Sequence, residues 1–367
     1  MSLVQDAAKL QLAINSLKSS LGVARVWGRP VLATLLAAAC TTRDGSMGNA
    51  EQSAADSLVN AARAVRMIPV LARAELRENS AAVMSATQAG VIFTINDSGH
   101  EAVLFALDTA GADRGAWMVR GATNHDWEAA ALGPCDKSPG QRPPRPGPVT
   151  ACIYIGDVGD NNASRPTRVL YRVREPRAGA PGSTDTVTAE RLEFRYSDGP
   201  HDVEALWVGR DGTTWLATKR RLRGSDGRTR PALVFAIHAS AWRERDSVVT
   251  AVLTDSLPVV PGSAPGRLIT DAALSSDGRR LAVRTYTEVF VFATDSTSGR
   301  VLHGSPLASC DVTGLRERQG EGITWLGTAG LLLLTSEGNR SPMHVIDCRP
   351  GAAAELIGRA PFTGDRR

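Results

Sequence analysis

The sequence has little lysine, no Cys-x-x-Cys pair and few aromatic residues. Lysine occurs only at positions 9, 18, 137 and 219, so nearly all of the 42 basic residues are arginine. Basic and acidic residues are interspersed, and no basic stripe alternates with aromatic residues, which argues against a nucleic-acid partner. The missing Cys-x-x-Cys argues against zinc-ribbon and thioredoxin-like sites. The missing Gly-x-Ser-x-Gly argues against the nucleophile elbow of serine hydrolases.

The chain also lacks a phosphate loop and any clear helical pattern beyond about residue 65. The segments "GRDG" and "SSDG" are typical of hairpin turns, so we expect no nucleotide cofactor. Hydrophobic residues make up 43% of the chain and charged residues 22%, with a net charge of +4. These values are typical of a folded soluble protein with one large domain or two ordinary ones.

The segment around Cys40 resembles the signal of bacterial lipoproteins. Arg25 and Arg29 precede a short apolar run, Val31–Ala39, which ends in three alanines directly before the cysteine. This run is too short to span a bilayer but suits a signal peptide. The resemblance implies export and lipidation of Cys40, whereas an ordinary signal peptide or a buried helix are the alternatives. Ala37 departs from the usual leucine of such signals.

We predict three parts of the chain on this basis. They are an N-terminal extension with the signal (residues 1–40), a polar tether (41–64) and a single domain (65–367). Apolar residues recur at helical spacing before residue 22, but we expect translation to begin later, at Val23 or Val26. The protein is then expected in the cell envelope, held to the membrane by a lipid anchor and monomeric.

An exported protein can keep disulfides, and four cysteines remain after Cys40. Cys135 and Cys152 flank a Pro/Gly-rich loop whose base they would close. Cys310 and Cys348 would then pair across neighbouring units.

A polar pentapeptide, His-Asp-x-Glu-Ala, occurs in "NHDWEAAAL" (124–132) and in "PHDVEALWV" (200–208). Weaker copies begin at residues 77, 268 and 320, and each copy is followed by a turn and further apolar runs. Each unit therefore reads as four short strands, which is typical of a propeller blade. We predict an all-β chain forming a β-propeller of five four-stranded blades, with six possible. Either the segment around Arg66 or residues 354–362 would complete the last blade.

In a propeller, the start of each first strand and the end of each second strand meet at one face near the axis. Polar residues occupy both places in this sequence. The first series contains Glu78, Asp126, Glu128, Asp202, Glu204, Asp271 and Glu321, and the second contains Asn96, Asp97, Asp157, Asp160, Asn161, Lys219, Arg284 and Glu337. We therefore expect a charged mouth at one end of the central channel.

The motifs "NDSG", "DWEA", "YIGDVGDN", "RTYT" and "GEGITW…TSEGNRSP" resemble bacterial extracytoplasmic β-propellers of the WD40-like and phytase-like type. The resemblance covers most of residues 75–345 and implies the propeller fold. It matches no complete catalytic signature of a characterised enzyme.

Crowded carboxylates repel one another unless they bind a cation, pair with a base or take up protons. Oxygen ligands suit calcium or another hard divalent ion, so we predict metal ligands at Asp126, Glu128, Asp202, Glu204 and Glu321. The candidate ligand-binding residues are Lys219, Arg284, Asn96 and Glu337. Alternatively, acids at these corners cap turns or lock strands. Likewise, Lys219 and Arg284 either neutralise Glu204 or Asp271, or bind an anionic group.

Three functions remain open. The first is an exported, lipid-anchored propeller that binds a ligand, possibly anionic and with a divalent cation, at its mouth. The second is a metal-dependent hydrolase of phosphate or carboxylate esters. The third is a structural interaction module whose partner is another envelope protein.

Overall fold

The computed structural model describes residues 60–70, 73–135, 151–219, 222–223, 229–259, 265–327 and 330–349. The chain divides into two compact units, Met1–Ala55 and Asp56–Arg367, and every described residue belongs to the second unit. The predicted signal and Cys40 therefore lie outside the described residues. No helix of the described part is long and apolar enough to cross a membrane.

The described strands form five antiparallel series of four strands each. The first series is β3 (Val83–Met84), β4 (Val91–Ile95), β5 (Val103–Asp108) and β6 (Asp113–Arg120). The second is β7 (Trp127–Pro134), β8 (Ala151–Asp157), β9 (Arg168–Arg174) and β11 (Glu190–Tyr196). The third is β12 (Val203–Val208), β13 (Thr214–Thr218), β16 (Ala232–Ile237) and β17 (Val249–Leu257). The fourth is β18 (Ile269–Leu274), β19 (Arg280–Thr285), β20 (Glu288–Ala293) and β21 (Ala308–Asp311). The fifth is β22 (Gly320–Leu326), β23 (Leu331–Ser336), β24 (Met343–Asp347) and β2 (Arg63–Ile68).

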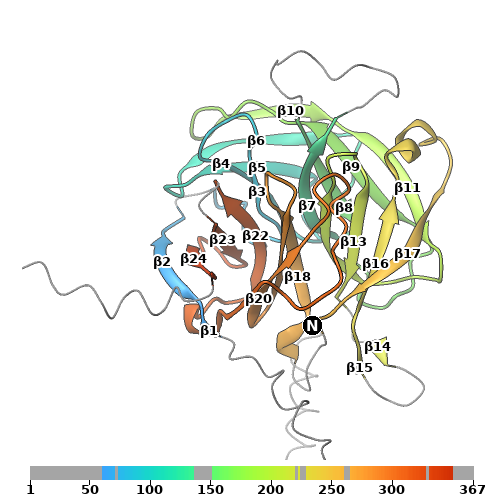
Figure 1. The fold of residues 1–367 in the computed structure, drawn as a ribbon. Coiled ribbons are helices and arrows are strands. Elements are labelled where there is room, and N and C mark those ends of the chain that lie inside the picture. The colour runs from blue at the N-terminus through green and yellow to red at the C-terminus, as the bar shows by residue number, and fades with distance from the viewer. Residues whose placement is uncertain are drawn as a thin grey trace, which may run out of the picture. The chain divides into compact units, whose positions relative to one another are not determined.

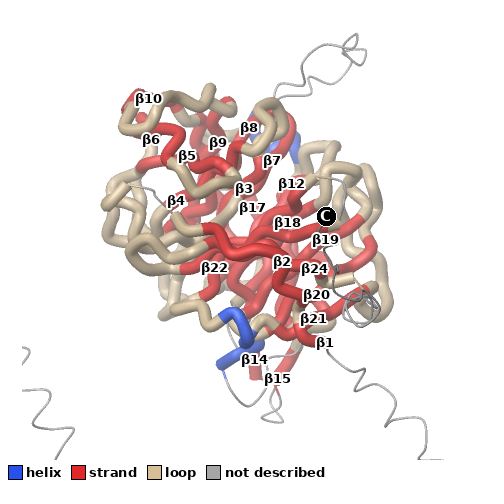
Figure 2. The backbone as a smooth tube through the Cα atoms, turned by 90° about the vertical axis from the view of Figure 1, so that its left-hand side faces the viewer, coloured by secondary structure: helices blue, strands red, loops and turns tan. Residues whose placement is uncertain are grey.

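The remaining elements are additions to these series. β1 (Asn60–Ala61) lies parallel to β21, and β10 (Thr184–Thr188) lies parallel to β6. β14 (Leu222–Arg223) and β15 (Thr229–Arg230) form a small hairpin. The described helices are the 3-10 turns η1 (Ala239–Arg243), η2 (Pro265–Arg267) and η3 (Thr313–Leu315), so strands dominate the trace in Figure 2.

The first strands of the series contact one another in a ring. β3 contacts β7 and β22, β7 contacts β12, β12 contacts β18, and β18 contacts β22. Figure 1 shows β7, β18 and β22 near the centre of this unit and β2, β10 and β17 at its periphery. The fold is a β-propeller, as the repeat predicts. The number of blades in the whole chain stays a prediction, since residues at both ends lie outside the described part.

Burial explains why strands of the repeat such as β4 and β12 are largely apolar runs and do not alternate between apolar and polar residues. Every residue of β4, "VIFTI", and of β12, "VEALWV", is buried, because these strands have a packed sheet on both faces. Five apolar clusters lie between consecutive series, the last between the fifth series and the first. Small residues such as Ala129, Ala205 and Ala272 occur in the first strands, where the sheets approach most closely.

The N-terminal strand completes the last series. β2 pairs with β24 in antiparallel register, with Met67 opposite His344. The segment around Arg66 is thus the observed outer strand, and the alternative segment 354–362 lies outside the described residues. Strand structure begins at Asn60, within the range predicted as a tether.

Both predicted disulfides are confirmed. Cys135–Cys152 closes the loop between β7 and β8 over a separation of 17 residues. Cys310–Cys348 joins β21 to the residue after β24, over a separation of 38 residues, and so links the fourth series to the fifth. Two disulfides indicate an oxidising, exported environment.

The loop lengths predict the stability that each disulfide adds. Loop-closure entropy assigns about 3–4 kcal/mol to loops of this size, with the larger value for the longer loop. We expect Cys310→Ala with Cys348→Ala to lower the urea midpoint more than Cys135→Ala with Cys152→Ala. Equal midpoints for wild type and the Cys310/Cys348 double variant would contradict this prediction.

Candidate functional site

The candidate site is a group of six carboxylates, which we call the acidic mouth. First strands begin, and second strands end, at the same end of the sheets, since Trp127 pairs with Asp157, Val203 with Thr218, and Gly320 with Ser336. Electrostatic interactions connect carboxylates from separate series: Glu128 with Glu204, Glu204 with Glu321, and Glu321 with Asp97. Within the fifth series, Glu321 also interacts with Glu337. The members of the acidic mouth are Asp97, Asp126, Glu128, Glu204, Glu321 and Glu337.

Three of these carboxylates converge. Oxygen atoms of Asp97, Asp126 and Glu128 all lie within 4.8 Å of one another. Asp126 directly precedes β7 and Glu128 lies within it, on either side of Trp127, whose ring packs 5.9 Å from the Tyr171 ring. The pairing of β7 with β8 is irregular between Trp127 and Ala129, so Glu128 lies at a β-bulge. Gly159 packs directly against both acids, since a Cβ at this position would meet Asp126 Oδ2 at 2.5 Å and Glu128 Cγ at 2.7 Å.

Like charges and burial raise the pKa of this cluster. Burial, then the Asp97 carboxylate, raises the pKa of Asp126 to about 6, against an opposing effect of Arg165. Burial, then Glu204 and Asp97, raises the pKa of Glu128 well above its ordinary value, although Lys219 lowers it. The charged form of Glu128 is therefore unfavourable without a further positive charge nearby.

Lys219 is the only lysine among the described residues, and it pairs with Glu204. Lys219 Nζ lies 3.0 Å from Glu204 Oε1 and 5.4 Å from the centre of the Tyr286 ring. Burial alone would lower the pKa of Lys219, but Glu204 and Glu321 raise it above the ordinary lysine value. The other oxygen, Glu204 Oε2, is buried and has no hydrogen-bond partner in the described structure.

Glu321 and Glu337 share a single donor. Gln319 Nε2 donates hydrogen bonds of 2.7 Å to Glu321 Oε1 and to Glu337 Oε1. Burial, then Glu321 and Asp97, raises the pKa of Glu337 to about 7, with Lys219 acting in the opposite direction. Glu321 is only 3% exposed, and its Oε2 atom also lacks a partner in the part of the chain that the structure describes.

Arg284, a predicted ligand-binding residue, is fully buried, and both of its Nη atoms bind other groups of the protein. Its Nη1 donates to the carbonyl oxygens of Gly322 and Thr335 at 2.8 Å, and its Nη2 pairs with Glu317. A Cβ at Gly320 would overlap the guanidinium group, at 1.9 Å from Nη2. Arg284 therefore forms its ion pair with Glu317, and its charge also lowers the pKa of the buried Asp271, one of the two acids that it was expected to neutralise.

Asn96, also predicted to bind ligand, binds the chain before β3 instead. Its Oδ1 accepts from the backbone N–H groups of Arg77 and Glu78 at 3.1 Å, and its Nδ2 donates to the Glu75 carbonyl at 2.7 Å. This amide is buried and has a structural partner on each side.

Asp202 and Asp271 act as locks between strands. Asp202 Oδ1 accepts from the Asp160 N–H at 2.9 Å. Asp271 accepts from the N–H groups of Ala272 and Ile323, both at 2.8 Å. These contacts fit the strand-locking alternative, so Asp202 differs in surroundings from the other predicted metal ligands.

Asp157 and Asp160 pair with arginines. Asp157 Oδ1 lies 2.7 Å from Arg165 Nη2, and Asp160 pairs with the buried Arg168. The "GDVGDN" loop is therefore held by ion pairs of its own.

Sequence reasoning did not assign a ligand role to Asp97, and it did not single out Tyr286 or Gln319. Asp97 lies in the quoted motif "NDSG" and Tyr286 in "RTYT", so a signal existed for both. Gln319 directly precedes the "GEG" motif but has no counterpart in the other units.

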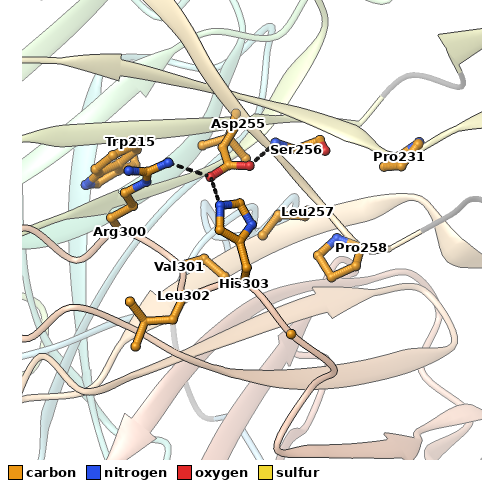
Figure 3. A pocket seen from close by; sticks show the side chains of 12 residues that line it. Trp215, Pro231, Asp255, Ser256, Leu257, Pro258, Arg300, Val301, Leu302 and His303 are labelled. Carbon is orange, nitrogen blue, oxygen red and sulfur yellow. Dashed lines mark hydrogen bonds and ion pairs between the residues drawn. The ribbon is translucent and has the colours of Figure 1, made fainter.

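A pocket of about 280 Å³ lies elsewhere on the propeller, around Trp215 and Asp255 (Figure 3). Asp255 Oδ2 lies 3.3 Å from Arg300 Nη2 and 3.9 Å from His303 Nε2, so its charges offset one another. Trp215 and Lys219 are four residues apart along one extended strand, about 13 Å. This pocket is therefore distinct from the acidic mouth.

No family model matches the sequence, and no curated protein sequence matches it. Solved structures are similar in fold. Myxococcus xanthus glutaminyl cyclase aligns at 15% identity over 79% of this chain and 98% of that chain, with a TM-score of 0.43. The Malassezia sympodialis allergen Mala s 1 aligns at 10% identity over 77% and 96%, with a TM-score of 0.46. The PQQ-bound aldose sugar dehydrogenase of Streptomyces coelicolor aligns at 10% identity over 78% and 98%, with a TM-score of 0.40.

The raised pKa values of Asp126 and Glu337 predict that stability depends on pH in metal-free buffer. Their folded-state pKa values, about 6 and about 7, exceed the ordinary 3.8 and 4.5. The folded state then binds more protons than the unfolded state between these values, so stability falls as the pH rises through this window. We expect a lower melting temperature in EDTA at about pH 8 than at about pH 5.5.

Glu337→Gln is the matched variant, because glutamine keeps an acceptor for Gln319 and removes the titrating group. We expect it to reduce the difference between the two pH values. The same pH difference in wild type and Glu337→Gln would speak against the assignment.

Proposed function

We propose that the protein is an exported β-propeller that binds a hard divalent cation, such as Ca²⁺, at its acidic mouth. The observation that carries this proposal is the convergence of Asp97, Asp126 and Glu128 oxygens within 4.8 Å. Ca²⁺ binds oxygen ligands at about 2.3–2.6 Å, so two ligands of one ion lie up to about 5 Å apart. The three carboxylates are thus near enough to share one ion.

The charge balance of the acidic mouth supports a cation. Among the described residues, Lys219 is the one positive side chain in ion-pair contact with any of its six carboxylates. Arg284 forms its ion pair with Glu317 outside the mouth, although its charge also lowers the pKa of Glu321. A bound divalent cation would offset the like-charge repulsion that raises the pKa of Glu128.

A second and independent feature also points to a ligand. Glu204 and Glu321 are 1% and 3% exposed, and one oxygen of each lacks a partner among the described residues. A buried, unpaired carboxylate oxygen is costly, so such groups generally meet a cation, a donor or a proton. Both oxygens belong to carboxylates that interact electrostatically within the acidic mouth.

A calcium titration tests this proposal. We expect Ca²⁺ to raise the melting temperature of the EDTA-treated protein, with a stabilisation of about 2.7 kcal/mol at 100 times Kd. Glu128→Gln should lower the Ca²⁺ affinity at least about tenfold, since it removes one charged ligand. In EDTA the same variant should melt no lower than wild type, because it also removes an unfavourable buried charge.

Asp185→Asn, on the exposed strand β10, is the matched control and should bind Ca²⁺ as wild type does. Isothermal calorimetry measures each affinity directly. The proposal is wrong if wild type shows no Ca²⁺ heat and no melting shift, or if Glu128→Gln and Asp185→Asn behave alike.

A metal-dependent hydrolase is the second candidate function. The unpaired oxygens of Glu204 and Glu321 favour it, because a carboxylate oxygen beside a metal site is suited to activate a water molecule. Turnover of a phosphate or carboxylate ester that requires Ca²⁺ and is lost in Glu321→Gln would support the hydrolase. Calcium binding without such turnover would leave the binding function alone.

We also propose that Cys40 carries the lipid anchor. The signal-like segment before it and the two disulfides support export. In a bacterial host, wild type should partition into the detergent phase of a Triton X-114 extract, whereas Cys40→Ser should stay in the aqueous phase. A mature protein that still contains a peptide from residues 3–18 would refute both lipidation and the late start.

A further inference from the structure

Another pocket, of about 500 Å³, lies at the same end of the propeller as the acidic mouth. It is formed by the turn between β19 and β20, by η3 and by the segment that leads into β22. We call it the arginine pocket, and its polar lining is Tyr286, Thr313, Arg316, Glu317, Arg318 and Gln319.

The two arginines are available to a ligand. Both side chains are exposed, and neither guanidinium group has an ion-pair or hydrogen-bond partner among the described residues. The acid between them does not neutralise them, because Glu317 pairs with the buried Arg284. The Arg318 side chain passes close to Gly338, where an added Cβ would lie 3.2 Å from its Cδ. Arg318 therefore reaches toward the loop that carries Glu337.

Hydrogen bonds fix the turn that carries Arg316, and Arg316 itself has a strained backbone conformation. Thr313 binds Asp311 Oδ1 through its N–H at 2.7 Å and its hydroxyl at 2.6 Å, and the Arg316 N–H donates to the Thr313 carbonyl at 3.2 Å. Arg316 itself has φ of 54°, a left-handed conformation in which glycine would be free of strain.

The arginine pocket and the acidic mouth share two walls. Tyr286 lines the pocket, and its ring centre lies 5.4 Å from Nζ of Lys219, which pairs with Glu204. Gln319 lines the pocket and donates to both Glu321 and Glu337. One ligand can therefore contact positive groups in the pocket and the carboxylates, or their bound cation, in the mouth.

We propose that the arginine pocket is an oxyanion subsite in which Arg316 and Arg318 bind a carboxylate or phosphate group of the ligand. Guanidinium groups suit both oxyanions because they donate in a planar, bidentate geometry. The hydroxyl groups of Tyr286 and Thr313 lie in the same lining as further donors. In its link to the mouth this inference rests on the proposed function, whereas the oxyanion subsite itself does not require a bound cation.

The test measures oxyanion binding without metal. Inorganic phosphate and acetate are titrated separately into the full chain in EDTA, and binding is followed by calorimetry. The combined variant Arg316→Gly and Arg318→Gln removes both charges, and glycine suits the left-handed backbone at 316. Loss of a charge-assisted contact costs at least about tenfold in affinity for each arginine, so the combined variant should bind at least about a hundredfold more weakly.

Arg243→Gln, on an exposed turn, is the matched control and should bind as wild type does. Phosphate binding without acetate binding identifies a phosphate subsite, and the reverse a carboxylate subsite; both support the proposal. It is overturned if neither anion binds wild type, or if the combined variant retains wild-type affinity.

Calcium binding by the combined variant separates the two proposals. Wild-type Ca²⁺ affinity with lost oxyanion binding supports both sites. Absence of Ca²⁺ binding in wild type, together with arginine-dependent oxyanion binding, overturns the cation site and leaves the oxyanion subsite standing.

Discussion

Closure of the ring of first strands forces acidic side chains from different sheets into one space, and the chemistry of the protein follows from this constraint. The acids belong to different series, and they interact because β7 contacts both β3 and β12, and β3 contacts β22. Five apolar clusters between the sheets supply the favourable burial that offsets this like-charge repulsion. The pairing of β2 with β24 and the Cys310–Cys348 disulfide secure the sheet at which the ring closes.

Polar residues near the acidic mouth divide into two groups by their partners. Asn96 and Asp271 have their polar groups occupied by backbone partners, so they fix strands. Glu204 and Glu321, by contrast, each use one oxygen and leave the other unpaired in the described structure. Glu204 and Glu321 therefore each keep an acceptor oxygen that a ligand at the mouth could use.

Much of the fold could be predicted because each unit contains short apolar runs that are separated by turn residues. The runs "VIFTI", "LVFAI" and "VFVFA" coincide with β4, β16 and β20. The polar strand β10, "TDTVT", escaped prediction because its burial pattern is mostly exposed and it pairs only at an outer edge. The repeat pattern also predicted that Asp126 and Glu128 would lie at one mouth, and Glu128 does interact with Asp126. It could not predict that Glu317 would occupy Arg284, or that Arg316 and Arg318 would lie beside Tyr286, because loop residues outside the repeat make these contacts.

Protons and the proposed cation would act on the same carboxylates, and this would link proton uptake to cation binding. Protonation of Glu337, whose pKa is about 7, would lessen the repulsion that a cation would otherwise offset. A cation at Asp97, Asp126 and Glu128 would in turn lower the pKa values of the surrounding acids and keep Glu204 and Glu321 charged. Lys219 then faces more negative charge and stays protonated, beside the Tyr286 ring. An oxyanion at Arg316 and Arg318 would raise the negative potential on the other side of Tyr286 and Gln319. Binding of a cation in the mouth and of an anion in the arginine pocket should therefore favour each other, since each supplies the charge that the other lacks.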